Sequence, residues 1–168
     1  MWVRRLQALW CNHDGSALVE GAVLVPLLIV VLFGVYEFSW FFYQQHLAST
    51  GVRDAARYLA RVNVPCDQDS PVWASQQAYA KNLATTGSIA GGSPRVKGWT
   101  TAMVTLRCHS IDNPIAPTGL SAYRGGPVIH VITVASSFTD PSLGFFSILG
   151  LPPPTISVLH SERVIGPG

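Results

Sequence analysis

The chain has 168 residues, of which 48% are apolar and only 12% are charged. This length suits one small domain with a further segment outside it, which excludes a large multidomain enzyme. The formal net charge of +2 comes from scattered residues, whereas nucleic-acid binding needs clustered Lys and Arg side chains, so we exclude a nucleic-acid partner. We expect the apolar excess to be local, as in a membrane segment joined to a domain outside the membrane.

Residues 21–43 form an apolar run with one charged residue, Glu37. A helix of about 20 residues crosses a hydrocarbon core of about 30 Å, so the run predicts one membrane-spanning helix. Aromatic residues fill positions 40–43, where such rings settle at the level of the lipid headgroups. The alternative is a cleaved secretory signal peptide, whose apolar part would be shorter, about 7–15 residues, and would end in small residues.

Basic residues stand on both sides of this run, so a count of positive charges does not decide its orientation. They are Arg4, Arg5, Arg53, Arg57 and Arg61. A long domain crosses the membrane largely regardless of its charge, and the longer part of the chain follows the run. We therefore expect a single-pass protein of the bacterial inner membrane, with a cytoplasmic N-terminus and a periplasmic or extracellular C-terminal domain.

Helical character continues from the apolar run to Arg61 without a break. Residues 71–86 predict a second helix, because Ser70 and Pro71 form a typical helix start and Gly87 a typical stop. One face of this helix is expected to pack on a sheet. Its residues are Val72, Tyr79, Ala80 and Leu83. Residues 87–98 are expected to form a loop.

Three later segments predict strands, namely residues 99–108, 128–138 and 155–165, with a long loop over 109–127. The fold class is therefore α+β, a long N-terminal transmembrane helix continuing into a small domain with a second helix and about three antiparallel strands. The connection 143–151 carries six large apolar residues. We expect it to contact the membrane surface or another subunit, and the alternative is that it covers the core of its own domain.

Gly15 and Glu20 precede the membrane helix, with a short basic leader ahead of them. A carboxylate deep in a membrane costs about 2.5–3.5 kcal/mol, and one at the interface costs little. This arrangement resembles the processing site of type IV-like prepilins, in which a membrane aspartyl peptidase cuts after the Gly. The resemblance implies cleavage between Gly15 and Ser16, with Glu20 as the fifth residue of the mature chain.

The wider run resembles the TadE-like family of minor pseudopilins from the Flp/Tad pilus machinery. The residues that carry the resemblance are Glu20-Gly21-Ala22, Pro26-Leu27-Leu28, Gly34, Glu37, Ala55-Ala56-Arg57, Ala60-Arg61 and, more loosely, Ser161-Glu162-Arg163. Major Flp pilins are much shorter and carry Glu-Tyr where this chain has Glu20-Gly21. The resemblance therefore implies an accessory subunit that acts by protein–protein contacts. Its implied partners are the prepilin peptidase, other pilus or pseudopilin subunits, assembly-platform proteins and inner-membrane lipid.

On this interpretation residues 1–15 are a prepilin-like leader, residues 16–61 are the transmembrane and juxtamembrane helix, and residues 62–168 are an extracytoplasmic α+β domain. Cleavage would remove Cys11 with the leader and leave Cys66 and Cys108 in an oxidising compartment. We expect these two residues to form a disulfide between the helix and the domain. The alternative is two unpaired buried thiols.

Five charged residues are candidates for assembly contacts. They are Glu20, Glu37, Arg53, Arg57 and Arg61. The three arginines recur every four residues and so share one helix face, which binds a partner, or lipid phosphates, or is simply solvated. Glu37 either pairs with a neighbouring helix or reaches the outer interface.

An enzyme would need a site that the sequence does not indicate. His109, His130 and His160 lie in or beside predicted strands without the spacing of a zinc motif, and none of the common catalytic or nucleotide-binding motifs is present. We expect neither a catalytic residue, nor a metal, nor a cofactor. A second hypothesis is an unrelated single-pass anchored domain that binds a ligand or an envelope partner, and it predicts an uncleaved N-terminus.

Overall fold

The computed structural model describes residues 14–62, 66, 69–124, 126–148 and 150–165. Most of the expected leader, residues 1–13, therefore lies outside the described residues. Two compact units divide the chain between Ser39 and Trp40. Helix α2 (Asp14–Ala60) is continuous over 47 residues, with Pro26 inside it.

The first unit contains the part of α2 that ends at Ser39. Large apolar side chains in it are exposed all around the helix, for example Leu32 at 68% and Val35 at 63%. A helix that is apolar all round and uncovered by protein is typical of a membrane span. By length and composition, one N-terminal helix of the described residues can cross a membrane.

The second unit is an α+β domain that starts at Trp40. After α2 it contains α3 (Pro71–Thr86), a 3₁₀ turn η1 (Thr101–Met103), β1 (Val104–Asp112), β2 (Val128–Thr139), α4 (Phe145–Ile148) and β3 (Thr155–Arg163). The strands form one antiparallel sheet in the order β1-β2-β3. The expected second helix and three antiparallel strands are confirmed.

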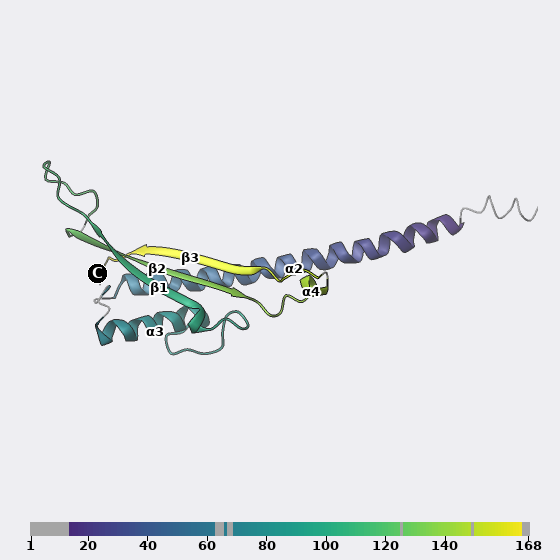
Figure 1. Cartoon of the computed structure of the whole chain (residues 1–168), viewed down its shortest axis with the longest axis horizontal. Helices are drawn as coiled ribbons and strands as arrows, with labels where there is room; N and C mark the ends of the chain where they lie inside the picture. The colour runs from purple at the N-terminus through teal and green to yellow at the C-terminus, as the bar shows by residue number, and fades with distance from the viewer. Residues whose placement is uncertain (1–13, 63–65, 67–68, 125, 149, 166–168) are drawn as a thin grey trace, which may run out of the picture. The chain divides into compact units, whose positions relative to one another are not determined.

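Helix α3 packs antiparallel to the C-terminal part of α2 (Figure 1). Gly51 of α2 lies against the carbonyl of Ala84, and one to two turns further along, Tyr58 of α2 donates a hydrogen bond to Gln76. The side chains of α3 that are buried include Trp73, Ala80 and Ala84. The expected face was therefore partly wrong, because Val72 and Tyr79 are 48% and 42% exposed. The helix turns its Trp and alanines inward because it packs on another helix.

The core lies between this helix pair and one face of the sheet. Helix α2 contributes small and medium side chains, α3 contributes Trp73, and the sheet contributes alternate residues of its strands. The buried strand residues of the core are Val104, Ile132, Val134, Phe138, Ile156 and Val158. Trp99 stacks on Phe138 with ring centroids 5.3 Å apart and donates its indole N–H to Ser136 at 2.9 Å.

The first strand starts later and ends later than the sequence pattern predicted. Residues 99–103 form turns, because Trp99 donates its backbone N–H to Val96 and Met103 donates to Thr100. Ala102 is therefore exposed in η1 and outside the strand. The strand continues through His109 to Asp112, where it still pairs with Val128.

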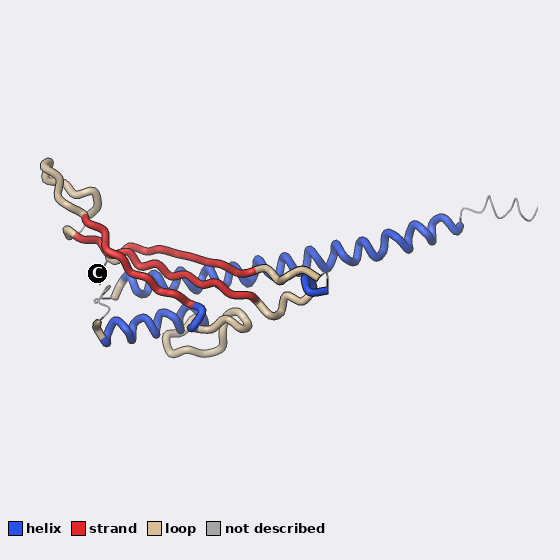
Figure 2. Tube along the Cα trace, in the orientation of Figure 1, coloured by secondary structure: helices blue, strands red, loops and turns tan. Residues whose placement is uncertain are grey.

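The two long connections of the sheet leave opposite ends of β2. Residues 113–127 join β1 to β2 at one end, and residues 140–154, which include α4, join β2 to β3 at the other (Figure 2). Leu143 of the second connection is 3% exposed and belongs to the core, whereas Ile148 and Leu151 are 79% and 53% exposed. Leu143 therefore covers the core of its own domain, and the expected contact of the segment 143–151 with the membrane surface or another subunit stays a prediction.

Candidate interaction surface

A row of arginines at the C-terminal end of α2 and directly after it is exposed to solvent. Arg53, Arg57 and Arg61 are all exposed and recur at intervals of four residues, which places them on one side of the helix. Their guanidinium groups form no hydrogen bond and no ion pair with the described residues. Like charges at this spacing repel by about 0.2–0.5 kcal/mol per pair, so the row is mildly unfavourable in the isolated protein.

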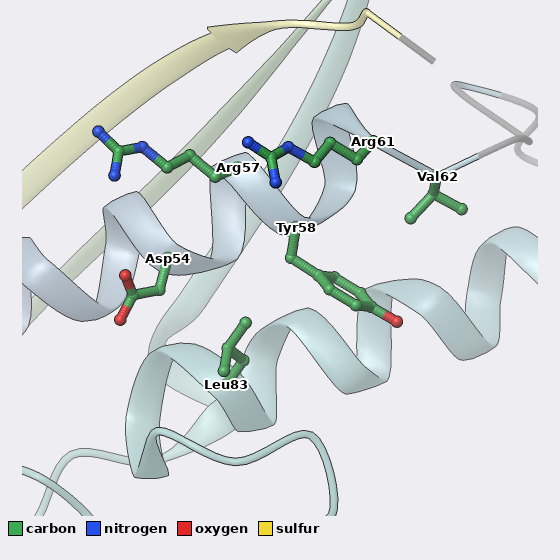
Figure 3. A pocket seen from close by; sticks show the side chains of 6 residues that line it. All are labelled: Asp54, Arg57, Tyr58, Arg61, Val62 and Leu83. Carbon is green, nitrogen blue, oxygen red and sulfur yellow. The ribbon is translucent and has the colours of Figure 1, made fainter. Parts of the chain in front are cut away.

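A hollow of about 540 Å³ lies beside this row, between α2 and α3. It is lined by Asp54, Arg57, Tyr58, Arg61, Val62 and Leu83. Figure 3 shows Arg57 and Arg61 extending from the same side of α2, while Tyr58 reaches toward α3. The surface is thus a shallow depression with two guanidinium groups at its rim.

Asp54, the acidic residue of the hollow, is already neutralised within the domain. Its Oδ2 accepts a hydrogen bond from Arg95 Nη2 at 2.8 Å. Arg95 also donates its backbone N–H to Thr85, and its guanidinium lies beside Gly87 at the C-terminal end of α3, where a positive charge is favoured. The remaining charge of the hollow is therefore positive and comes from Arg57 and Arg61.

Tyr58 fixes one wall of the hollow. Its hydroxyl donates a hydrogen bond to Gln76 Oε1 on α3. Burial raises the pKa of this hydroxyl above its usual 10.0, and the neighbouring Tyr79 raises the pKa further. Tyr58 is therefore neutral at physiological pH and helps hold α2 to α3.

The acidic candidates precede the residues of this surface along the chain. Gly15 and Ser16 are in the first turn of α2, so the expected scissile bond is in helical backbone, and Glu20 is exposed. Glu37 is 7% exposed and does have an interaction partner. Glu20 and Glu37 belong to the first compact unit.

The expected cysteine pair comes together in space. Cys66 and Cys108 lie at disulfide distance, with Cα atoms 5.5 Å apart and a separation of 42 positions along the chain. That Cα–Cα distance is within the usual range for a disulfide, and it places the segment after α2 beside the middle of β1.

The three histidines of the α+β domain that the sequence analysis considered do not converge. His130 Nδ1 lies 2.9 Å from Ser110 Oγ, His160 Nε2 lies 3.0 Å from Glu162 Oε2, and His109 is exposed. Within the part of the chain that the structure describes, no group of three or more His, Cys, Asp or Glu side chains is placed to hold a metal ion.

Residues 15–57 match the family model of TadE-like proteins. This segment is TadE-like. The match starts in the first turn of α2 and ends at Arg57, so it covers Glu20, Glu37, Arg53 and Arg57. No curated protein and no solved structure matches the chain. The sheet and α3 lie outside the TadE-like segment, and their arrangement is described by the structure alone.

Several side-chain contacts of the domain gave no signal in the sequence. Asp54 and Arg95 are 41 positions apart, and Trp40 and Ser142, which also share a hydrogen bond, are 102 apart. Such pairs depend on the tertiary fold. Gly51 did carry a signal, because an isolated glycine within a long helical pattern often marks a close packing contact.

Proposed function

We propose that this chain is a minor pseudopilin that acts in Flp/Tad pilus assembly through protein–protein contacts. The match of residues 15–57 to TadE-like proteins is the observation that carries the proposal. The exposed apolar part of α2 and the exposed arginine row that follows it support a role in an assembly. The proposed action is binding, without catalysis.

We place the apolar helix in the bacterial inner membrane, with the N-terminus cytoplasmic and the α+β domain on the far side. The exposed apolar residues of the helix and the aromatic group at Trp40–Tyr43 support the span. The cysteine pair supports an oxidising compartment for the domain, because disulfides persist there and are rare in the cytosol.

The arginine row fits a protein partner better than lipid. At about 1.5 Å per residue, Arg53 lies about 15 Å beyond Tyr43 along α2, and Arg61, directly after the last helical residue Ala60, lies about 27 Å beyond Tyr43. The headgroup layer is only about 5–8 Å thick on each side of the hydrocarbon core. Arg57 and Arg61 would therefore face water above the membrane, where acidic groups of another pilus, pseudopilin or assembly-platform subunit can reach them.

Processing by the prepilin peptidase would cut between Gly15 and Ser16 and expose a new α-amine. Glu20 would then lie four residues, about 6 Å, along the helix from this amine. An ammonium and a carboxylate at the edge of the hydrocarbon are each costly alone, and pairing reduces both costs. We propose that the amine of one subunit meets Glu20 of its neighbour, which would favour one docking register.

N-terminal sequencing of the membrane-extracted protein tests the processing step. A mature chain that begins at Ser16 supports the proposal. An intact N-terminus contradicts it and favours an unrelated anchored domain, for which the hollow of about 540 Å³ beside Tyr58 would be the candidate ligand site.

The second experiment is Glu20→Gln, scored separately for leader removal, membrane level and pilus production. We expect a normal membrane level and a loss of pili, because the amide cannot neutralise the amine. Asp112→Asn removes an exposed carboxylate at the end of β1 and is the matched control. If Glu20→Gln is processed, accumulates normally and supports wild-type pili, Glu20 has no role in assembly.

A further inference from the structure

The connection between β2 and β3 is unusual in composition. From Pro141 to Leu159 the chain contains no Asp, Glu, Lys or Arg. Within this stretch Ile148 and Leu151 are 79% and 53% exposed, and the rings of Phe145 and Phe146 are half-buried. An uncharged segment with this much exposed apolar surface calls for a covering partner.

A hydrogen bond fixes the position of this connection along α2. Trp40 donates its indole N–H to Ser142 Oγ at 3.1 Å. Ser142 is itself held by Asp140, whose Oδ1 accepts from the Ser142 backbone N–H at 2.8 Å and from its hydroxyl at 2.7 Å. Asp140 is fully buried and Leu143 is 3% exposed, so the start of the connection is anchored in the domain.

The connection is anchored to Trp40, which belongs to the aromatic group at positions 40–43 that ends the apolar run. Trp40, Phe42 and Tyr43 are 38%, 62% and 53% exposed, and the rings of Trp40 and Tyr43 lie 5.6 Å apart. Exposed Trp and Tyr at the end of an apolar span mark the membrane–water interface. The Trp40–Ser142 bond therefore brings α4 and its flanking residues to the depth of that interface.

The backbone of the connection also suits a poorly hydrated environment, where an unsatisfied N–H or C=O is costly. Ser147 donates its N–H to Gly144, Gly150 donates to Ser147, and Leu151 donates to Phe146. The next three residues are Pro152, Pro153 and Pro154, which have no N–H to leave unsatisfied.

Exposure alone would not single out this connection. At the opposite end of β2, Ile115 and Leu120 are 72% and 73% exposed in the loop 113–127. That end is about 36 Å away along the strand and has no bond to the aromatic end of α2 among those that the structure gives. Loop 113–127 also contains Arg124, which is exposed.

We propose that residues 144–148, 150 and 151 form a second membrane contact, in which the apolar side chains around α4 lie in the lipid interface at the level of Trp40. The proposal rests on the membrane anchoring proposed above. The contact would hold the domain at two points on the bilayer, at α2 and at α4, and would limit its rotation and tilt relative to the membrane.

The test places the photo-crosslinking residue benzoylphenylalanine at single positions of the full-length chain in its native membrane. Position 148 probes the proposed contact, and position 151 is a second probe in case the first variant accumulates poorly. Position 31, in the apolar helix, is the lipid control, and position 120 is the exposed apolar control at the far end of the sheet. After illumination, mass spectrometry distinguishes phospholipid adducts from protein adducts.

We expect phospholipid adducts at positions 148 and 151 at a yield close to that of position 31, and none at position 120. Protein adducts alone at 148 and 151 would show a subunit contact and overturn the proposal. Absence of any adduct there, with lipid adducts at 31, would overturn it while leaving the anchor intact. Absence of lipid adducts at 31 would overturn the proposed anchor itself, whatever position 148 shows.

Discussion

Gly51 on α2 and Ala84 on α3 meet where the two helices cross. A Cβ at position 51 would collide with the carbonyl oxygen of Ala84 and would lie 2.9 Å from Cη2 of Trp99. Trp99 in turn donates its indole N–H to Ser136 on β2. The missing side chain of Gly51 thus lets α2, α3 and the sheet approach one another at a single point.

We predict that Gly51→Ala destabilises the domain. Overpacking of a tight core costs about 1–3 kcal/mol, whereas replacing a helical glycine with alanine returns at most about 1 kcal/mol. Gly34→Ala makes the same change in the same helix, at a position with no atom within 4 Å of the added Cβ, and should not destabilise the protein. Thermal unfolding of the full chain in detergent compares the two. Equal stability of both variants would mean that α2 and α3 do not approach as closely as described.

The helices could be predicted from the sequence because their signals are local. A long apolar run, the Ser70-Pro71 start and the Gly87 stop give helix positions directly, and Gly87 indeed ends α3 with a left-handed φ of 82°. The packed face of α3 was harder to predict. Trp73, Ala80 and Ala84 face inward, but alanine is only weakly hydrophobic. The more hydrophobic Val72 and Tyr79 therefore led to the wrong face being predicted.

The candidate surface likewise has one part that the sequence predicts and one part that it does not. The arginine row could be read from its spacing because it needs only a continuous helix. The hollow beside the arginines could not, since it requires α3 to lie against α2 and Arg95 to reach Asp54 from a loop. Likewise, the apolar character of 143–151 was visible in the sequence, and its place beside Trp40 was not.

We predict that Cys66 and Cys108 are oxidised in the mature protein and stabilise it. A bond that closes a loop with a separation of 42 residues contributes about 4 kcal/mol on the loop-entropy model. Cys66→Ser, Cys108→Ser and the double variant should therefore lose similar amounts of stability, because each removes the same bond. Mass spectrometry of the non-reduced protein should show the cross-linked peptide pair. Two alkylatable thiols in the untreated wild-type protein would refute this prediction.

Tyr58 should make the stability of the domain sensitive to alkaline pH. Because its pKa is raised in the folded state, the neutral hydroxyl stabilises the fold below pH 10, and this contribution is lost as the pH rises through the folded-state pKa. Tyr58→Phe should lose about 1 kcal/mol at neutral pH, from the hydrogen bond to Gln76. The difference from wild type should shrink above pH 10.

Unfolding measured from neutral to alkaline pH checks this expectation. Tyr123→Phe, which changes a tyrosine that is 54% exposed in the loop 113–127, is the control for alkaline effects elsewhere. A Tyr58→Phe penalty that stays constant with pH would assign Tyr58 a packing role only.

The arginine row should be needed for pilus assembly and not for folding. Replacing Arg53, Arg57 and Arg61 together with Gln removes two like-charge pairs, each unfavourable by about 0.2–0.5 kcal/mol, so the variant should be at least as stable as wild type. If an acidic partner binds this row, the same variant should lose pili while its membrane level stays normal. Changing the three residues to Lys keeps the charge and should retain part of the function.

The matched control for this prediction is Arg107→Gln, which removes an exposed arginine from the edge strand β1 and should leave pili unchanged. Arg95→Gln is the contrasting case, because it breaks the pair with Asp54 and should lower stability by up to about 1 kcal/mol. Pilus counts and unfolding measurements on the same variants separate the two effects. Normal pili in the triple Gln variant would show that the row is a solvated face, and the partner surface would then have to be sought elsewhere on the domain.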